Sequence, residues 1–200
     1  MKKQTVFVIA MLLAVVILFI TCNPDEGRME KEKYEASFRK NGVYENPEQY
    51  GQHLVTLMGC NDCHTPKRMG KFGPELDSVL MLSGRPAKRP LFDIDRKAMS
   101  GKGLTVTDDL TAWAGPWGVS FTANLTPDET GLAGWTLDQF KIAIRHGKYH
   151  GMENGRTLLP PMPWEMYKHM SDDEMAAVFA YLKTLTPINN LVPAPLPPAH

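Results

Sequence analysis

The run Cys60-Asn61-Asp62-Cys63-His64 constrains this chain of 200 residues more than any other feature. Two thiols three positions apart can each add to one vinyl group at the same edge of a porphyrin, and the histidine that follows can then bind the iron. A C-x-x-C-H run is the attachment signal for c-type haem. We therefore predict one haem c, joined covalently to Cys60 and Cys63, with His64 as an axial ligand of the iron.

Other uses of a cysteine pair fit this sequence less well. The chain has three cysteines, so a structural zinc site with four Cys or His ligands would need a histidine pair, and His146 and His150 lie far downstream. A thioredoxin-like redox pair expects a strand–helix–strand setting, whereas loops rich in Pro and Gly surround this one. A disulfide between Cys60 and Cys63 would close a very small loop and add little stability.

The second axial ligand is predicted to be Met162. This residue lies in the stretch Leu158–Trp164, which three prolines stiffen. Fixed φ angles reduce the entropy that is lost when a side chain is held in one place. A neutral thioether also raises the potential of haem iron relative to harder donors. Two alternatives stay open at this point: a histidine, His146 or His150, takes the position, or the sixth site is vacant.

The spacing of apolar residues and the capping signals predict three helices. The first begins at Pro47 and ends at Gly59, the second covers residues 136–146, and the third covers residues 171–185 behind a capping box at Ser171. The stretch 65–135 is rich in Gly and Pro, and strand patterning is weak. We therefore expect an all-α fold with few helices and long loops, in which the first helix crosses the last and the haem lies between them and the Met162 loop.

The N-terminus has the layout of an export signal. Lys2 and Lys3 precede an apolar run of 15 residues, Val6–Ile20. As a helix this run is about 22 Å long, shorter than the roughly 30 Å of a bilayer core. Cys22 follows after Thr21, as an acylated lipoprotein cysteine would. Residues 1–22 are thus an export signal or an N-terminal anchor, and lipoprotein, uncleaved anchor and released protein all remain open.

The remaining chain divides into three parts. Residues 23–45 are a charged linker, residues 46–190 the haem domain, and residues 191–200 a Pro-rich tail that is either an extended strap or disordered. The formal net charge is zero and there is no basic run, which excludes a nucleic-acid partner. Export agrees with the predicted haem, since c-type haem is attached outside the cytoplasmic membrane.

Several further motifs, in order over about residues 47 to 190, resemble a class I cytochrome c domain. More narrowly, they resemble the monohaem cytochrome c domains akin to cytochrome subunits of membrane-associated dehydrogenases. The matching segments are Cys60–Pro66, Gly73–Leu76, Asn124–Asp128, Thr130–Gly131, Trp135–Thr136, Arg145–Gly147, Pro161–Trp164 and Ala176–Leu182. The resemblance implies the cytochrome c fold, thioether bonds at Cys60 and Cys63, and axial ligation by His64 and Met162. It also implies that the Pro74 carbonyl accepts the Nδ1 proton of His64.

The chain departs from those subunits in one respect. They often carry three C-x-x-C-H runs, and this chain carries one, so a relay of several haems within it is excluded. The stretch 77–116 is also long for a small cytochrome, and its composition does not decide its role. Four residues are candidates for contact with the haem propionates, with ordinary packing as the alternative for each: Arg85, Asn124, Trp135 and Arg145.

These features predict a single-electron carrier that is not itself an enzyme. We expect it to be tethered at the outer, periplasmic face of the cytoplasmic membrane, alone or as a subunit of an oxidoreductase complex. Its redox partners would be a dehydrogenase, a quinol-oxidising complex or a terminal oxidase. The alternative is a catalytic, peroxidase-like haem protein or a ligand sensor, either of which needs a labile sixth site.

Overall fold

The computed structural model describes residues 28–29, 32 and 44–199, and from Pro47 onward these form one compact unit. The expected export signal or anchor over residues 1–22, with Cys22, lies outside the described residues, as does most of the charged linker over residues 23–45. No helix within the described part of the chain is long and apolar enough to cross a membrane.

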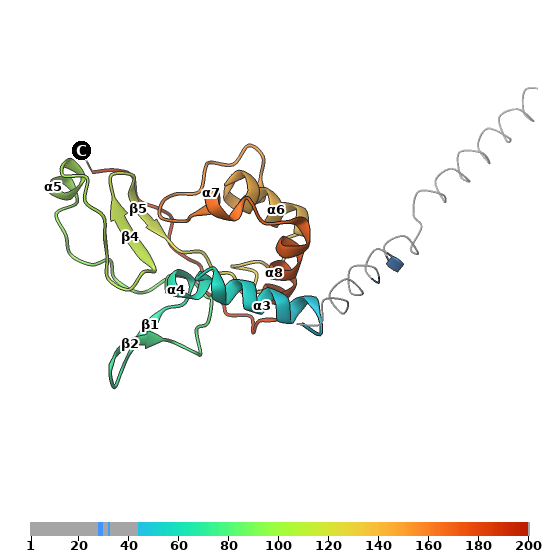
Figure 1. Ribbon diagram of the computed structural model, residues 1–200. Coiled ribbons are helices and arrows are strands. Elements are labelled where there is room, and N and C mark those ends of the chain that lie inside the picture. Colours follow the sequence, from blue (N-terminus) through green and yellow to red (C-terminus); the bar gives the residue numbers. More distant parts are fainter. Residues whose placement is uncertain (1–27, 30–31, 33–43, 200) are drawn as a thin grey trace, which may run out of the picture. The chain divides into compact units, whose positions relative to one another are not determined.

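Two helices from opposite ends of this unit pack across each other. Helix α3 spans Pro47–Leu57 and helix α8 spans Asp172–Thr184 (Figure 1). They approach so closely at Gly51 that a Cβ there would run into the carbonyl of Ala177. This confirms the expected crossing of the first and last helices. The core beneath it consists of buried apolar side chains: Val55, Leu82, Leu132, Phe140, Met175, Val178 and Leu182.

The predicted helix boundaries follow from their caps. Helix α6 spans Leu137–His146 and begins with a reciprocal capping box between Thr136 and Gln139. It ends at Gly147, whose φ of 62° is easily adopted only by glycine. Helix α8 begins with a second capping box, at Ser171. All three long helices are thus confirmed close to their predicted bounds.

Four shorter helical elements join these. Helix α4 spans Cys60–His64, α5 spans Arg96–Gly101, the 3-10 turn η1 spans Tyr149–Gly151, and α7 spans Trp164–Tyr167. Of these, α4 carries the C-x-x-C-H run, and α7 begins two residues after Met162, behind Pro163.

The expectation of an all-α fold is wrong, because the loop-rich middle of the chain contains two small antiparallel sheets. One is the hairpin of β1 (Lys67–Gly70) and β2 (Gly73–Leu76). The other has β3 (Val106–Thr107), β4 (Ala112–Gly115) and β5 (Gly118–Phe121) in that order. Strands of two to four residues are too short for an alternating pattern to stand out in the sequence. The fold is therefore mixed α and β.

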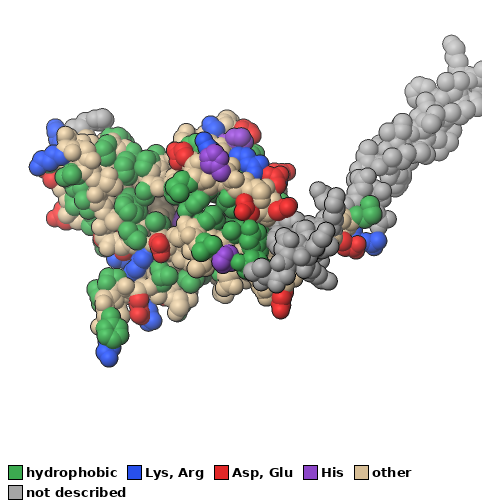
Figure 2. Space-filling view, in the orientation of Figure 1, with side chains coloured by type: hydrophobic (Ala, Val, Ile, Leu, Met, Phe, Trp, Pro, Cys, Tyr) green, Lys and Arg blue, Asp and Glu red, His purple; other side chains and the backbone are tan. Residues whose placement is uncertain are grey.

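The two sheets differ in their surroundings. The β1–β2 hairpin projects from the body of the domain, and hydrophobic side chains are exposed on it, with Met69 80% and Phe72 95% accessible (Figures 1 and 2). In contrast, β5 is buried between β4 and the C-terminal tail. The backbone of Leu196 pairs with that of Val119 through hydrogen bonds of 2.9 and 3.0 Å. Of the two alternatives for the tail, the structure shows the extended strap.

Candidate functional site

Helix α4 brings the two cysteines and the histidine of the C-x-x-C-H run together. Gly59 precedes the helix with φ 67°, which lets the chain turn sharply out of α3. Three positions apart on a helix, the side chains of Cys60 and Cys63 lie on one face, and both thiols are free. Burial raises the pKa of Cys60 to about 11, and burial likewise raises the pKa of Cys63. Both are therefore protonated thiols at neutral pH.

His64 is held by a backbone carbonyl, but not by the expected one. Its Nδ1 lies 2.8 Å from the carbonyl oxygen of Ala123, in the segment that follows β5. Pro74 instead lies in the β1–β2 hairpin, paired with Met69. The prediction that the Pro74 carbonyl accepts the His64 proton is therefore wrong. Any residue type can supply a carbonyl, so no side-chain signal in the sequence marks Ala123 for this role.

The state of the His64 ring follows from its surroundings. Burial lowers the pKa of His64, with only the hydrogen bond to Ala123 opposing that effect, so the imidazole is neutral at neutral pH. A carbonyl oxygen can only accept, so the ring proton is on Nδ1 and the lone pair is on Nε2. A neutral imidazole with its lone pair on Nε2, beside two free thiols, is the donor set that a covalent haem requires. The residues present therefore fit this group.

Helix α4 is also fixed at both ends. After it, Lys67 donates its ammonium protons to the carbonyl of Asp62 and, at 2.9 Å, to that of Thr65. Before it, the hydroxyl of Tyr167 on α7 donates to the carbonyl of Met58 at 2.6 Å. Burial raises the pKa of Tyr167 to about 12, so this hydroxyl keeps its proton and remains a donor. The second bond ties the segment after Met162 to the start of the haem-attachment run.

Met162 lies in a loop that packs on the end of α6. A Cβ at Gly147 would run into the ring of Trp164, and the Gly147 carbonyl accepts from the amide of Leu158 at 2.7 Å. Met162 itself is half-buried. The two histidines considered as alternative ligands, His146 and His150, are both exposed.

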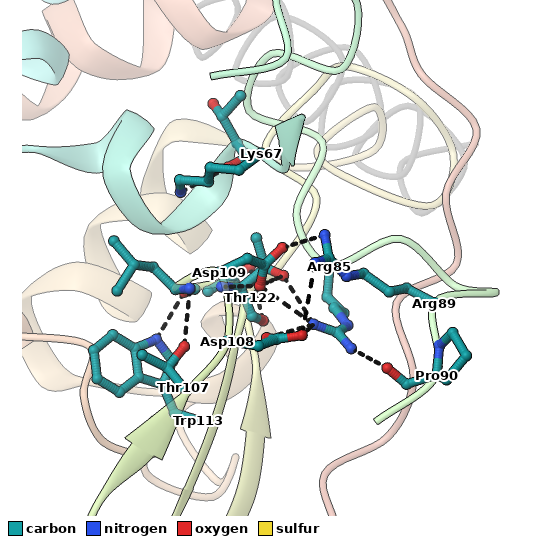
Figure 3. Close-up of polar contacts among 12 residues, drawn as sticks. Lys67, Arg85, Arg89, Pro90, Thr107, Asp108, Asp109, Trp113 and Thr122 are labelled. Atoms are coloured by element: carbon teal, nitrogen blue, oxygen red, sulfur yellow. Dashed lines mark hydrogen bonds and ion pairs between the residues drawn. The ribbon is translucent and has the colours of Figure 1, made fainter. Parts of the chain in front are cut away.

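A buried ion-pair cluster, which sequence reasoning missed, holds the stretch between the two sheets (Figure 3). The guanidinium of Arg85, with 1% of its side chain exposed, lies 3.1 Å from Asp108 and 3.3 Å from Asp109. It also donates to the carbonyl of Pro90 at 2.5 Å. Arg89 reaches Asp109 at 2.7 Å. Each of these ion pairs joins residues that are at least 20 positions apart in the sequence, a separation at which no local pattern relates them.

The charge of Asp109 is stabilised within this cluster. Burial alone would raise the pKa of Asp109, but hydrogen bonds from the side chain and amide of Thr111 and the charge of Arg89 lower it overall. The Thr111 hydroxyl donates to Asp109 at 2.6 Å. Asp109 is therefore a carboxylate at neutral pH, as its two arginine partners require.

The four propionate candidates lie in different settings. Asn124 donates to the carbonyl of Ile188 at 2.8 Å, and Arg145 pairs with Asp172 at 2.7 Å. Trp135 is half-buried against the core. The Nε of Arg85 is buried and has no hydrogen-bond partner, whereas its other nitrogens are paired. Within the described residues, no group of three His, Cys, Asp or Glu side chains could hold a metal ion.

Several curated proteins are similar to this chain. It is 42% identical over 69 residues to the gluconate 2-dehydrogenase cytochrome c subunit of Pantoea cypripedii, covering 34% of the chain and 15% of that protein. It is 34% identical over 135 residues to the fructose dehydrogenase cytochrome subunit of Gluconobacter japonicus, covering 67% of the chain and 20% of that protein. A diheme cytochrome c-type protein of Cereibacter sphaeroides is 27% identical over 139 residues, 68% of the chain and 36% of that protein.

No family model matches the chain. The matched segments span only 6 to 20% of the three relatives that rank first, so the likeness concerns a part of each. Both dehydrogenase subunits above are named as cytochrome subunits, and helix α4 of this chain carries the donor set that covalent haem requires. The chain is a c-type cytochrome related to the cytochrome c subunits of dehydrogenases.

Proposed function

We propose that this protein transfers single electrons through one haem c, bound covalently to Cys60 and Cys63, with His64 and Met162 as axial ligands. The observation that carries the proposal is the state of His64: buried, neutral, and held by Ala123 so that Nε2 is free to bind iron. When bound, the haem would supply an Fe(III)/Fe(II) couple. The single C-x-x-C-H run supports a count of one.

The residues around His64 would tune such a centre. A hydrogen bond from the ligand's second nitrogen fixes the ring orientation and increases the basicity of the first. The Ala123 carbonyl makes that bond at 2.8 Å. With 9% of the residue exposed, His64 is also largely shielded from water. A ligand that does not move or exchange between oxidation states keeps the reorganisation on electron transfer small.

Three observations support Met162 as the second ligand. It is half-buried in a loop with three prolines, whereas His146 and His150 are exposed. Its loop packs on Gly147 through Trp164. Finally, the hydroxyl of Tyr167, five residues after Met162, donates to the backbone carbonyl of Met58, two residues before Cys60. A thioether ligand would place the potential above that of a bis-histidine haem.

The names of the relatives supply the proposed partners. Two are cytochrome subunits of gluconate and fructose dehydrogenases, and we extend this association to the chain: it would take electrons from a membrane-associated dehydrogenase. A quinol-oxidising complex or a terminal oxidase would be the other partner. The export signal expected over residues 1–22 supports a place at the outer face of the cytoplasmic membrane, tethered by that segment or by acylation at Cys22.

Optical spectroscopy of the haem-loaded protein tests the proposal. We expect low-spin spectra in both oxidation states, a ferric sulfur-to-iron charge-transfer band, and no change of the ferrous spectrum with carbon monoxide. The intact mass should exceed that of the polypeptide by one haem. A high-spin ferric spectrum, or ready binding of carbon monoxide, would show an open sixth site and favour the peroxidase-like or sensing alternative.

A further inference from the structure

We propose that Ser120 is a positioning residue for Met162. The segment Gly118–Ala123 thereby makes hydrogen bonds that hold both proposed axial ligands in place. The inference rests on the ligand set proposed above. It assigns a role to the small sheet β3–β5, which was not predicted from the sequence.

The first contact is between β5 and the Met162 loop. Ser120 is 8% exposed, and its Oγ lies 2.5 Å from the carbonyl oxygen of Pro160, two residues before Met162. The same oxygen accepts from the indole nitrogen of Trp117 at 3.2 Å. Among the residues that the structure describes, the other acceptor near this hydroxyl, the Trp113 carbonyl, is 3.5 Å away. A serine hydroxyl has one proton, so it is donated to Pro160.

The second contact is made three residues later on the same segment. The carbonyl of Ala123 accepts the Nδ1 proton of His64 at 2.8 Å. An extended chain advances about 3.3 Å per residue, so Ser120 and Ala123 are separated by roughly 10 Å. One stretch of backbone thus contacts the axial histidine and the loop of the axial methionine.

The segment is a rigid support for these contacts because it is paired with other backbone segments along both of its edges. Ser120 is paired in register with Trp113 on β4, and the neighbouring Val119 is paired with Leu196 of the tail. A hydroxyl on a strand paired at both edges has little freedom to move. The Ser120 bond therefore fixes the loop relative to the sheet, whereas a bond within the loop would not.

The expected consequence of losing the hydroxyl is local. A Ser120→Ala substitution leaves the Pro160 carbonyl without its donor and frees the loop from the sheet. Loss of one intramolecular hydrogen bond typically changes an equilibrium by up to about tenfold. The fraction of molecules in which Met162 has left the iron should rise by about that factor, while the fold persists.

The experiment compares full-length, haem-loaded Ser120→Ala with wild type and with a matched control, Thr122→Ala. Thr122 is on the same segment, but its hydroxyl contacts the carbonyl of Thr111 at 3.3 Å. Two readouts are followed in denaturant: the ferric sulfur-to-iron band and far-ultraviolet circular dichroism. In Ser120→Ala we expect the band to disappear well before the helices unfold, and ferrous carbon monoxide binding to rise about tenfold. In Thr122→Ala the two transitions should stay together.

The other possible results of this experiment contradict either the role of Ser120 or the ligation by Met162. If Ser120→Ala loses the band together with its helices, as the control does, Ser120 is only structural and the inference is overturned. If wild type lacks the band, Met162 is not the ligand, and the proposed function fails in that respect before any variant is made. Should Ser120→Ala not fold, Trp117→Phe, which removes the donor to Ser120 Oγ, must show the same early loss of the band to a smaller extent.

Discussion

At the scale of single residues, the site depends on which atoms face the two ends of an imidazole. The Ala123 carbonyl accepts the Nδ1 proton of His64 and leaves Nε2 free for the proposed bond to iron. This acceptor could not be predicted, because a carbonyl belongs to every residue and only the fold selects it. The assignment of the thiols and His64 to a haem remains a prediction, made from the sequence because covalent attachment needs those side chains at that spacing.

Met162→Ala tests the second ligand at this scale. Loss of the thioether should remove the ferric sulfur-to-iron band, lower the reduction potential and open the ferrous haem to carbon monoxide. Redox titration and absorption spectra measure these changes. Met166→Ala is the matched control: Met166 is 71% exposed on α7, so its removal should leave both the spectrum and the potential as they are. Unchanged spectra in Met162→Ala would contradict the assignment.

At the scale of elements, the helices could be read from the sequence and the strands could not. Capping boxes at Thr136 and Ser171 and a glycine at the end of α6 are local signals, and each helix begins or ends beside its signal. The strands are very short, and the tertiary contacts of the fold determine which strand pairs with which. The ion-pair cluster around Arg85 joins residues that only the folded loop brings together.

Gly51→Ala tests the crossing of α3 and α8. The new methyl group would run into the carbonyl of Ala177, and crowding of this kind costs about 1–3 kcal/mol. For a domain of this size, Tm should fall by about 2–4 °C for each kcal/mol. Gly101→Ala is the control, since a Cβ there meets nothing within 4 Å. A Tm equal to that of wild type in thermal denaturation would show that the two helices can move apart freely.

Asp109→Asn tests the buried ion-pair cluster. Removing one partner of a buried pair costs about 3–5 kcal/mol, because Arg85 and Arg89 lose a carboxylate that they share. The pKa of Asp109 is lowered in the fold, so its contribution is present above the unfolded value of about 3.9 and is lost as the pH falls through the folded pKa. Wild type should therefore lose more stability than the variant on acidification below about pH 4.

Denaturant unfolding at a series of pH values measures both effects. Asp93→Asn is the comparison, because Asp93 is an exposed carboxylate of the same stretch. It should unfold at nearly the wild-type midpoint at neutral pH. Equal pH dependence in Asp109→Asn and wild type would mean that this carboxylate carries no linkage to folding.

At the scale of the whole molecule, the domain closes on itself through its C-terminal tail. The backbone of Leu196 extends the β3–β5 sheet, and Arg96 on α5 donates to the carbonyl of Pro197. The Pro-rich composition of the tail left a strap and disorder equally open. What decides between them is the edge of β5 that β4 does not cover, a partner that lies nearly 80 residues earlier in the sequence.

Truncation after Pro193 tests this closure. Without Leu196, the amide of Val119 loses its acceptor at 2.9 Å, so amides of β5 should exchange with deuterium faster. Amides within α8, which pair inside their own helix, should keep their protection. Hydrogen-exchange mass spectrometry measures both regions in one experiment. Equal acceleration in β5 and α8 would instead mean that the tail holds the whole domain together.

The chain has 12 methionines, and their rates of oxidation should report how accessible each part of the domain is to solvent. Met69 on the projecting hairpin is 80% exposed and Met166 on α7 is 71% exposed, whereas Met175 in the core is fully buried. Conversion of a thioether to a sulfoxide requires access of the oxidant to sulfur. A mild oxidant should therefore mark the hairpin first and the helix crossing last. Met162, whose sulfur would be occupied by iron, should become oxidised only once it has left the haem.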